Sequence, residues 1–390
     1  MTSESAVSAT LRAGLVPSHD VSAAQAISKQ RETGETMRIK NLLLAASLAW
    51  LTASLPAVGG TLLVANKSAA SVSLFDEDAY ALVATVAVGQ GPHEIAVSPD
   101  GLSAVVSNYG TRGKPGSSLS LIDIGNATVV KTLQLPPDCR PHGVQWLDHQ
   151  TVAVTAEGID SLLLVDTGDG EISAQISIEQ SVTHMLTLSP DAALAYAANI
   201  GSGTVSIISL AQRRKLQDIR AGEGTEGIAL VGGSEVWVSN RQDGSVQVFD
   251  GQSFESLAVL PLGGFPIRVE PDDQRGRVYV TQAVGDSLAV YDAATRELLE
   301  RVDFSGESSL RRSGGSMLSD LSNGSIPVGL LLSGNGDRIY VAHTQADAIS
   351  VIDAQSLQLL RVLDAGDEPD GMAWSPLRSD LSRGTSAAGR

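Results

Sequence analysis

The stretch GPHEIAVSPDG (91–101), with AVVSN (104–108) and SLSLIDIGNATVVKTLQL (118–135) after it, sets a pattern that recurs along the chain. Ile95 and Val97 alternate with smaller residues, which is the period of a β-strand. The apolar segments that follow have the same character and are separated by turn sequences. The pattern therefore predicts four short antiparallel strands in succession.

Turn chemistry marks where these strands end. In SPDG (98–101) proline fixes φ at the second turn position and glycine accepts φ > 0 at the last, so the chain reverses there. Asp123 ends the third strand by starting a turn, because an aspartate can accept hydrogen bonds from its own backbone. Aspartates stand at the corresponding place in five other copies: Asp76, Asp166, Asp250, Asp292 and Asp353.

The copies follow one another without a break, and the first of them lacks an opening strand. They span residues 61–89, 91–135, 140–178, 182–222, 225–263, 265–304 and 326–366. A period of about forty residues with four strands per copy is typical of a β-propeller. The isolated strand EPDGMAWSP (368–376) matches the one that the first copy lacks. We therefore predict an all-β, seven-bladed β-propeller closed by its C-terminal strand, which leaves no open sheet edge at the ring closure.

Composition agrees with this class. The 390 residues are 43% hydrophobic with 39 glycines, enough for a large core and many turns. A net charge of −17 disfavours nucleic acid or an anionic membrane as partner. Cys139 is the single cysteine, which excludes an internal disulfide and a thiolate metal cluster.

The N-terminal region has the composition of an export signal. Residues 1–36 are polar and small, and we expect them to be disordered or untranslated. A positively charged start, an apolar run at 42–55 and a small-residue cleavage site predict a signal peptide over 37–59. The apolar run is shorter than the ~20 residues of a spanning helix, so no membrane anchor is expected. We predict a periplasmic or secreted monomer with its propeller at 60–376 and a disordered tail at 377–390.

Three segment pairs resemble a known repeat. They are AVVSN with LSLID, VYVTQ with LAVYD, and RIYVAH with ISVID. They resemble the YVTN-type β-propeller repeat, and the likeness covers 61–376. The resemblance implies an exported propeller in a family of mostly unassigned role, similar to the methylamine dehydrogenase heavy subunit and the d1-haem domain of nitrite reductase. No CxxCH haem-attachment motif is present.

Alignment of the copies on the opening strand places seven residues in one register: Asp370, His93, His142, His184, Glu226, Ile267 and Val328. Opening strands line the central channel of a propeller, so this register predicts a ring at one mouth. Three imidazoles with carboxylates suit Zn²⁺, Fe²⁺, Mn²⁺ or Cu²⁺ and leave a coordination position open. The alternative is that each imidazole bonds only to the backbone or to a neighbouring side chain.

A second register follows at the end of the second strand: Asn66, Asn108, Ala156, Asn199, Asn240, Gln282 and His343. The second strand returns to the same face of the propeller. We therefore predict that Asn108, Asn199 and Asn240 contact a ligand. Blade order places His343 beside Asp370, which adds it to the predicted metal ligands.

Two insertions are predicted on that face. They are GTRGKPGSS (110–118) and the Gly/Ser-rich stretch 305–325, whose length allows a lid over the mouth. They contain Arg112, Lys114, Arg311 and Arg312. Such a basic collar favours a small anionic ligand, and the alternative is that solvated loops simply carry charge.

The sequence leaves three functions open. The first is a propeller that binds a small molecule or a protein at the channel mouth, with or without a metal. The second is a metal-dependent enzyme, a lactonase-like hydrolase or an oxidoreductase, which uses the same residues. The third is a non-catalytic scaffold acting through blade edges. Propellers host many unrelated activities, so the fold alone does not decide between them.

Overall fold

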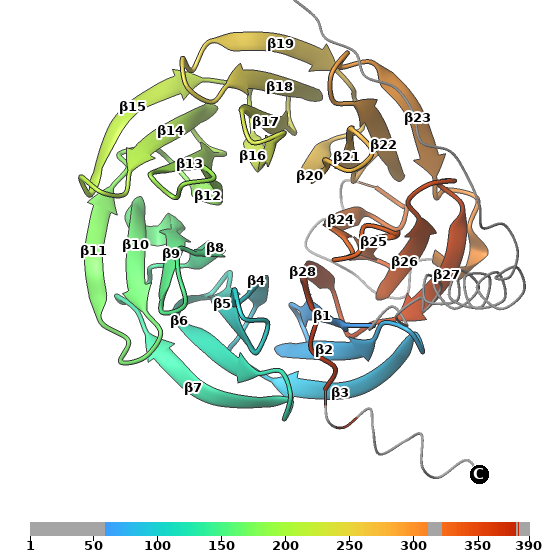
Figure 1. Cartoon of the computed structure of the whole chain (residues 1–390), viewed down its shortest axis with the longest axis horizontal. Coiled ribbons are helices and arrows are strands. Elements are labelled where there is room, and N and C mark those ends of the chain that lie inside the picture. Colours follow the sequence, from blue (N-terminus) through green and yellow to red (C-terminus); the bar gives the residue numbers. More distant parts are fainter. Residues whose placement is uncertain (1–58, 311–321, 380, 382–390) are drawn as a thin grey trace, which may run out of the picture. The chain divides into compact units, whose positions relative to one another are not determined.

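The computed structural model describes residues 59–310, 322–379 and 381. Residues 59 onward form seven four-stranded antiparallel sheets placed around a common axis (Figure 1). The predicted seven-bladed all-β propeller is confirmed. In the described part of the chain no helix has the length and apolar character needed to cross a membrane. The predicted leader and extension at 1–58 and the predicted tail from 382 lie outside the described residues.

The strands of the first four blades are as follows. Blade 1 contains β1 (Thr61–Asn66), β2 (Ser71–Asp76), β3 (Ala81–Ala87) and the C-terminal β28 (Pro369–Ser375). Blade 2 contains β4 (Pro92–Val97), β5 (Ser103–Thr111), β6 (Lys114–Asp123) and β7 (Thr128–Gln134). Blade 3 contains β8 (Pro141–Trp146), β9 (Thr151–Ala156), β10 (Ser161–Asp166) and β11 (Ile172–Ser177). Blade 4 contains β12 (Thr183–Leu188), β13 (Leu194–Asn199), β14 (Thr204–Ser209) and β15 (Arg214–Arg220).

The remaining three blades follow the same order. Blade 5 contains β16 (Thr225–Val231), β17 (Glu235–Asn240), β18 (Ser245–Asp250) and β19 (Ser256–Pro261). Blade 6 contains β20 (Pro266–Asp272), β21 (Arg277–Gln282), β22 (Ser287–Asp292) and β23 (Leu298–Asp303). Blade 7 contains β24 (Pro327–Leu332), β25 (Arg338–His343), β26 (Ala348–Asp353) and β27 (Leu359–Asp364). Two 3₁₀ turns, Glu157–Ile159 and Ser308–Leu310, complete the described elements.

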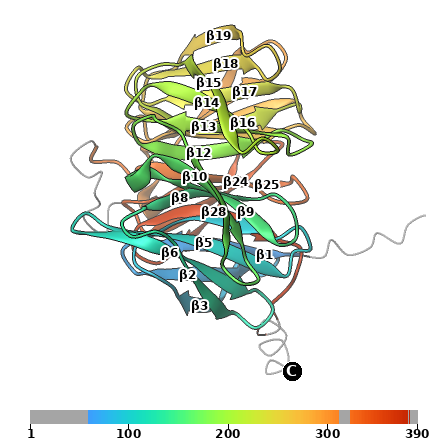
Figure 2. The same ribbon diagram turned by 90° about the vertical axis from the view of Figure 1, so that its left-hand side faces the viewer.

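Hydrophobic cores lie between the facing sides of successive sheets. Figure 2 shows the sheets of the ring from the side. Leu63 and Leu74 of blade 1, for example, pack in one cluster with Val106 and Ile122 of blade 2. In blade 3, for example, the second strand β9 is buried along nearly its whole length, whereas the outermost strand β11 exposes every second residue. The innermost strands therefore face the channel and the outermost strands face solvent.

The ring closes through β28, which pairs antiparallel with β1, as in Leu63 opposite Ala373. Glu77, at 3% exposed, joins both chain ends to blade 7. Its carboxylate accepts hydrogen bonds from Gly60 N (3.2 Å), Trp374 Nε1 (2.7 Å) and Tyr340 Oη (2.9 Å). The packed chain continues three residues beyond the predicted end at 376, to the buried Ser379.

Aspartates end the third strands as expected. Asp76 Oδ1 accepts from the backbone N–H groups of Asp78 (3.0 Å) and Ala79 (2.9 Å), which fixes the turn into the outer strand. Asp166, Asp250, Asp292 and Asp353 make the same pair of bonds. The role of these aspartate side chains is therefore to stabilise turns, and they are not candidates for ligand binding or catalysis.

One backbone feature recurs in all seven blades and positions the channel mouth. The residue two places before each opening-strand register position has φ between 48° and 72°; these residues are Gly91, Arg140, Val182, Gly224, Phe265, Ile326 and Glu368. Its carbonyl accepts, at 3.0–3.2 Å, the N–H of the residue directly after the second-register position of the same blade. Every blade thus presents its first and second strands to the mouth in the same alignment.

The two insertions differ from the sequence prediction. Residues 110–118 are not a loop, because β5 and β6 continue as a ladder to Thr111 opposite Lys114, with Arg112 and Gly113 as the turn. In the second insertion the side chain of Leu310 is only 3% exposed and packs in the core between blades 6 and 7. Residues 311–321, with Arg311, Arg312 and the greater part of the expected lid, lie outside the described residues.

We expect Glu77→Ala to lower the free energy of unfolding by about 3 kcal/mol, because it leaves the buried donors of Trp374 and Tyr340 without an acceptor. Urea denaturation followed by tryptophan fluorescence measures this loss. Glu297→Ala removes an exposed turn carboxylate and is the matched control, with an expected change within about 0.5 kcal/mol. Equal stability of the two variants would contradict the role given to Glu77 in ring closure.

Candidate functional site

The structure brings all seven residues of the opening-strand register together at one mouth of the channel. They line a cavity of about 190 Å³. Its wall contains the five polar members, His93, His142, His184, Glu226 and Asp370, and the aliphatic Ile267 and Val328. Residues that lie far apart in the chain are therefore neighbours here, because each blade contributes its first strand to the axis.

A β-bulge in each opening strand directs these side chains inward. In blade 2 the ladder passes from Pro92 opposite Asn108 to Ile95 opposite Val106, so that His93 and Glu94 together face one residue. The same shift occurs in the other six blades. A bulge turns two successive side chains the same way. This explains why Glu94, and Arg268 in blade 6, enter the channel beside their register neighbours.

The second register is displaced from the site by one residue. The residues lining the cavity are those directly after it: Lys67, Tyr109, Glu157, Ile200 and Arg241. Successive side chains of a strand point to opposite sides, so the register residues themselves turn into the blade. Asn199 Nδ2, for example, donates to Thr204 Oγ1 (3.0 Å) and Ser206 Oγ (2.9 Å).

Asn66, Asn108 and Asn240 make the same kind of bond to serine hydroxyls of the third strand, and all are buried. The asparagines predicted to contact a ligand therefore hold second and third strands together. Asn108, Asn199 and Asn240 do not line the mouth cavity.

His343 also lies away from the other histidines. Its Nδ1 is 2.7 Å from Ser325 Oγ and its Nε2 is 2.8 Å from Ser350 Oγ, so both ring nitrogens are occupied. Burial lowers the pKa of His343 to about 3, which keeps the ring neutral. The structure thus separates His343 from the predicted ligand set, and its role is to link blade 7 internally.

Arg268 organises the charges of the mouth. It extends from β20 to Glu94 of blade 2, with which it forms a short ion pair, and lies 3.5 Å from Asp370 Oδ1 and 3.9 Å from Glu226 Oε1. Asp370 also contacts Lys67 Nζ at 3.1 Å and His93 Nδ1 at 3.0 Å.

Neighbouring cations decide the ionisation of these buried acids. Burial alone would raise the pKa of Asp370, but Lys67, His93 and Arg268 hold it well below its usual range. Burial also opposes ionisation of Glu226, yet hydrogen bonding to His184 and the cation of Arg241, 2.6 Å away, lower its pKa to about 2. Both carboxylates are therefore anionic at neutral pH.

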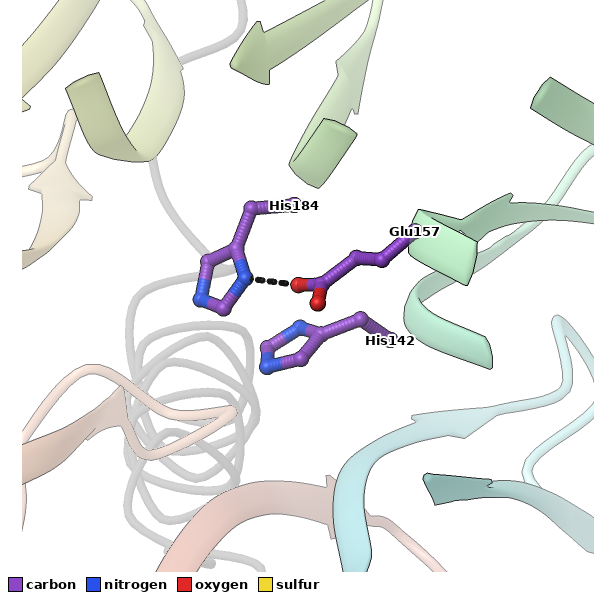
Figure 3. A group of neighbouring side chains, drawn as sticks. All are labelled: His142, Glu157 and His184. Atoms are coloured by element: carbon purple, nitrogen blue, oxygen red, sulfur yellow. Dashed lines mark hydrogen bonds and ion pairs between the residues drawn. The ribbon is translucent and has the colours of Figure 1, made fainter. Parts of the chain in front are cut away.

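His142, Glu157 and His184 form a group in which one ligand atom from each lies within 4.8 Å of the others (Figure 3). His184 Nδ1 forms a short hydrogen bond with Glu157 Oε1, and its Nε2 lies 3.5 Å from Glu226 Oε1. The rings of His142 and His184 lie with their centroids 3.6 Å apart and their planes tilted by 33°.

The two imidazoles of this group differ in charge. Burial would lower the pKa of His184, but the carboxylates of Glu157 and Glu226 outweigh it and raise the value to about 9. Burial and the neighbouring His184 push the pKa of His142 well below its ordinary range. A neutral imidazole thus lies against an imidazolium.

His142 is 1% exposed, and neither of its ring nitrogens has a hydrogen-bond partner among the described residues. Buried polar atoms are nearly always paired, so an unpaired pair of nitrogens beside a carboxylate indicates a position for a ligand. A neutral imidazole nitrogen can coordinate a metal ion or accept a hydrogen bond.

Sequence reasoning missed Glu157, Lys67, Arg241 and Arg268 as residues of this site. Three of them follow a second-register residue directly. Strand alternation predicts that these neighbours point to opposite sides, but it does not say which of them faces the channel, because the second strand is buried on both faces. Arg268 follows the aliphatic Ile267 and is turned inward by the bulge, a feature that carries no signal of its own in the sequence.

The comparisons with known proteins identify the class and no more. No protein-family model and no curated protein matches the chain. The periplasmic gluconolactonase PpgL of Pseudomonas aeruginosa is similar at a TM-score of 0.64 and 18% identity, over 81% of this chain and 99% of that one. Hydrazine synthase of Kuenenia stuttgartiensis is similar at 0.62 and 20%, over 77% and 94%.

Dihydro-heme d1 dehydrogenase NirN, in complex with DHE, is similar at a TM-score of 0.56 and 16% identity, over 81% of this chain and 75% of that one. At these identities the likeness shows a shared fold alone. The chain is a β-propeller whose structural relatives include an enzyme of lactone chemistry and a haem-binding protein.

The pKa of His184 generates a pH prediction for the metal-free protein. A folded pKa near 9, above the ordinary 6.5, contributes stability that is full below pH 6.5 and is lost as the pH rises to about 9. The size of this contribution is about 3 kcal/mol. We expect the difference in free energy of unfolding between the wild type and His184→Gln to shrink by that amount across this range. If this difference in free energy of unfolding is the same at every pH between 6.5 and 9, the raised pKa of His184 is contradicted.

We expect Asn199→Ala to lower the free energy of unfolding by about 2 kcal/mol, because Thr204 and Ser206 lose their buried partner. Ligand affinity at the mouth should not change, since Asn199 turns away from the cavity. Asn126→Ala, in an exposed turn, is the control for stability. If Asn199→Ala lowers ligand affinity but not the free energy of unfolding, Asn199 contacts the ligand and this prediction is wrong.

Proposed function

We propose that the channel mouth binds one divalent transition-metal ion through His142, Glu157 and His184 and presents it to a small-molecule ligand. The observation that carries this proposal is the buried His142 imidazole, unpaired at both nitrogens beside the other two side chains. Two imidazole nitrogens and one carboxylate oxygen are donors suited to Zn²⁺, Fe²⁺, Mn²⁺ or Cu²⁺. His184, an imidazolium in the metal-free protein, would release one proton to solvent when it coordinates the ion.

The spacing supports a site of this kind. With ligand bonds of about 2.0–2.2 Å, neighbouring donors around a tetrahedral zinc ion lie about 3.4 Å apart. The donor atoms of this group already lie within 4.8 Å of one another, so small side-chain rotations bring them to that spacing. Three protein ligands leave a fourth position open toward the cavity.

Tyr109 and Glu226 support the group from outside. The Tyr109 hydroxyl donates to Glu157 Oε2 at 2.6 Å, and Glu226 lies 3.5 Å from the second nitrogen of His184. Partners of this kind orient ligands and tune their basicity. Metal affinity should therefore depend on these two residues as well.

A metal-dependent hydrolase is the second candidate, because an ion with an open position can polarise a carbonyl or activate water. Its support is the open position itself, together with the fold shared with a gluconolactonase. The non-catalytic scaffold predicts instead that the mouth binds neither metal nor small molecule.

We further infer that the chain is an exported propeller of the YVTN type that works in the periplasm. This rests on the leader-like sequence at 37–59 and on the repeat segments. Mass determination of protein recovered from the periplasmic fraction tests it. A mature chain that begins near residue 60 supports export, and full-length protein in the cytoplasm contradicts it.

Zinc titration of the metal-free protein by calorimetry tests the proposed function. We expect one zinc ion per chain, with affinity at least about a hundredfold lower in His142→Ala and in Glu157→Gln, because each removes a direct ligand. His149→Ala changes an exposed turn histidine and should leave affinity unchanged. Thermal denaturation checks that each variant is folded.

Zinc binding that survives both substitutions would contradict the assigned ligand set. Absence of zinc, iron, manganese and copper binding would overturn the metal proposal. Hydrolysis of a simple lactone by the zinc-loaded wild type, lost in Glu157→Gln and retained in His149→Ala, would favour the enzyme over the binding protein.

A further inference from the structure

A groove of about 420 Å³ opens beside the channel mouth over blades 1 and 2. It shares Lys67, His93 and Tyr109 with the wall of the mouth cavity. The two spaces are therefore adjoining compartments of one site. The volume falls within the range of about 300–1,000 Å³ typical of small-molecule pockets.

The extended hairpin of blade 2 builds one wall of this groove. Its strands β5 and β6 have 9 and 10 residues, whereas β9 and β10 of blade 3 have 6 each. Backbone of the added segment, Gly110 and Thr111, lines the groove. The insertion thus creates a compartment at this blade that the six-residue hairpin of blade 3 would not form.

The residues that line the groove carry a net positive charge, whereas the protein as a whole is strongly negative. Arg112 and Arg140 line it together with Lys67, whose ammonium contacts Asp370 of the mouth at 3.1 Å, and Glu368 is the one acidic residue in its described lining. The Glu368 carboxylate accepts a hydrogen bond from Ser68 Oγ at 2.5 Å. In a chain of net charge −17, this local excess of cations favours an anionic group.

Arg140 is held in place before any ligand arrives. Its guanidinium stacks 5.0 Å from the centre of the Tyr109 ring and donates from Nη2 to Thr111 O at 3.1 Å. A guanidinium fixed in this way loses little further freedom on binding, and its planar donors match a carboxylate or phosphate. Tyr109 in turn donates to Glu157, so one contact chain joins the groove to the proposed metal ligands.

We infer that the groove binds the carboxylate or phosphate of a small molecule whose other end reaches the metal in the mouth. Arg112 and Arg140 supply the charge-assisted donors for the anionic group. This inference rests on the proposed function, since the metal provides the second point of attachment. It specifies the ligand as a small anion with a second oxygen donor several bonds away.

Calorimetric titration of the zinc-loaded protein tests the inference, with succinate, inorganic phosphate and uncharged succinamide as probes. We expect succinate to bind and succinamide not to. Affinity should fall by about tenfold or more in Arg112→Gln and in Arg140→Gln, because each loses one charge-assisted contact. Arg214→Gln, in an exposed strand of blade 4, is the matched control and should leave succinate affinity unchanged.

Zinc affinity is measured in the same variants and separates the two claims. Zinc binding without succinate binding, or succinate affinity equal in the wild type and both arginine variants, overturns the inference and leaves the metal site standing. Absence of zinc binding overturns the proposed function instead. Phosphate binding tighter than that of succinate, with the same arginine dependence, supports the groove with a phosphate ligand. Arg112 lies in the hairpin turn, so its variant remains informative if Arg140→Gln disturbs the hairpin.

Discussion

In every blade the N–H directly after the second-register residue donates to the carbonyl of a residue with positive φ, two positions before the register residue that lines the channel. This backbone bond is independent of side-chain identity, because glycine, arginine, valine, phenylalanine, isoleucine and glutamate all occupy the acceptor position. It aligns two chain segments per blade at one mouth. Side chains on this frame can therefore vary from blade to blade without moving the wall of the site.

The blades differ in what they place on that frame. Blades 2, 3 and 4 contribute the imidazoles His93, His142 and His184, whose rings lie against one another, and blades 6 and 7 contribute the aliphatic Ile267 and Val328. Arg268 crosses from the aliphatic side to carboxylates of other blades. Desolvating these charges costs several kcal/mol per ion, which only a nearly complete set of partners offsets. Among the described residues, His142 is the imidazole of the mouth whose two ring nitrogens both lack a hydrogen-bond partner, beside this ion-paired network.

Three residues, Lys67, His93 and Tyr109, line both the mouth cavity and the groove, and Tyr109 makes the most contacts between them. Tyr109 lies in the wall of both, bonds Glu157 through its hydroxyl and supports Arg140 on its ring face. A ligand in the groove and an ion in the mouth would each contact neighbours of this tyrosine. The long hairpin of blade 2 makes the arrangement asymmetric, so the seven-fold frame carries a site on one side of its axis.

The sequence by itself determined the blade count, the strand order, the closure by the C-terminal strand and the gathering of His93, His142 and His184. These follow from strand periodicity and turn residues, which are local properties repeated in each copy. Tertiary structure alone decided that the asparagines of the second register turn into the blade while Glu157 faces the channel, that His343 is enclosed by two serines, and that residues 110–118 extend a hairpin. It also decided that Arg268 pairs with Glu94, 174 residues away. Three features depend on neighbouring blades: the bulges, the direction of a side chain at a strand end, and the contacts across the channel. A local sequence pattern therefore does not predict them.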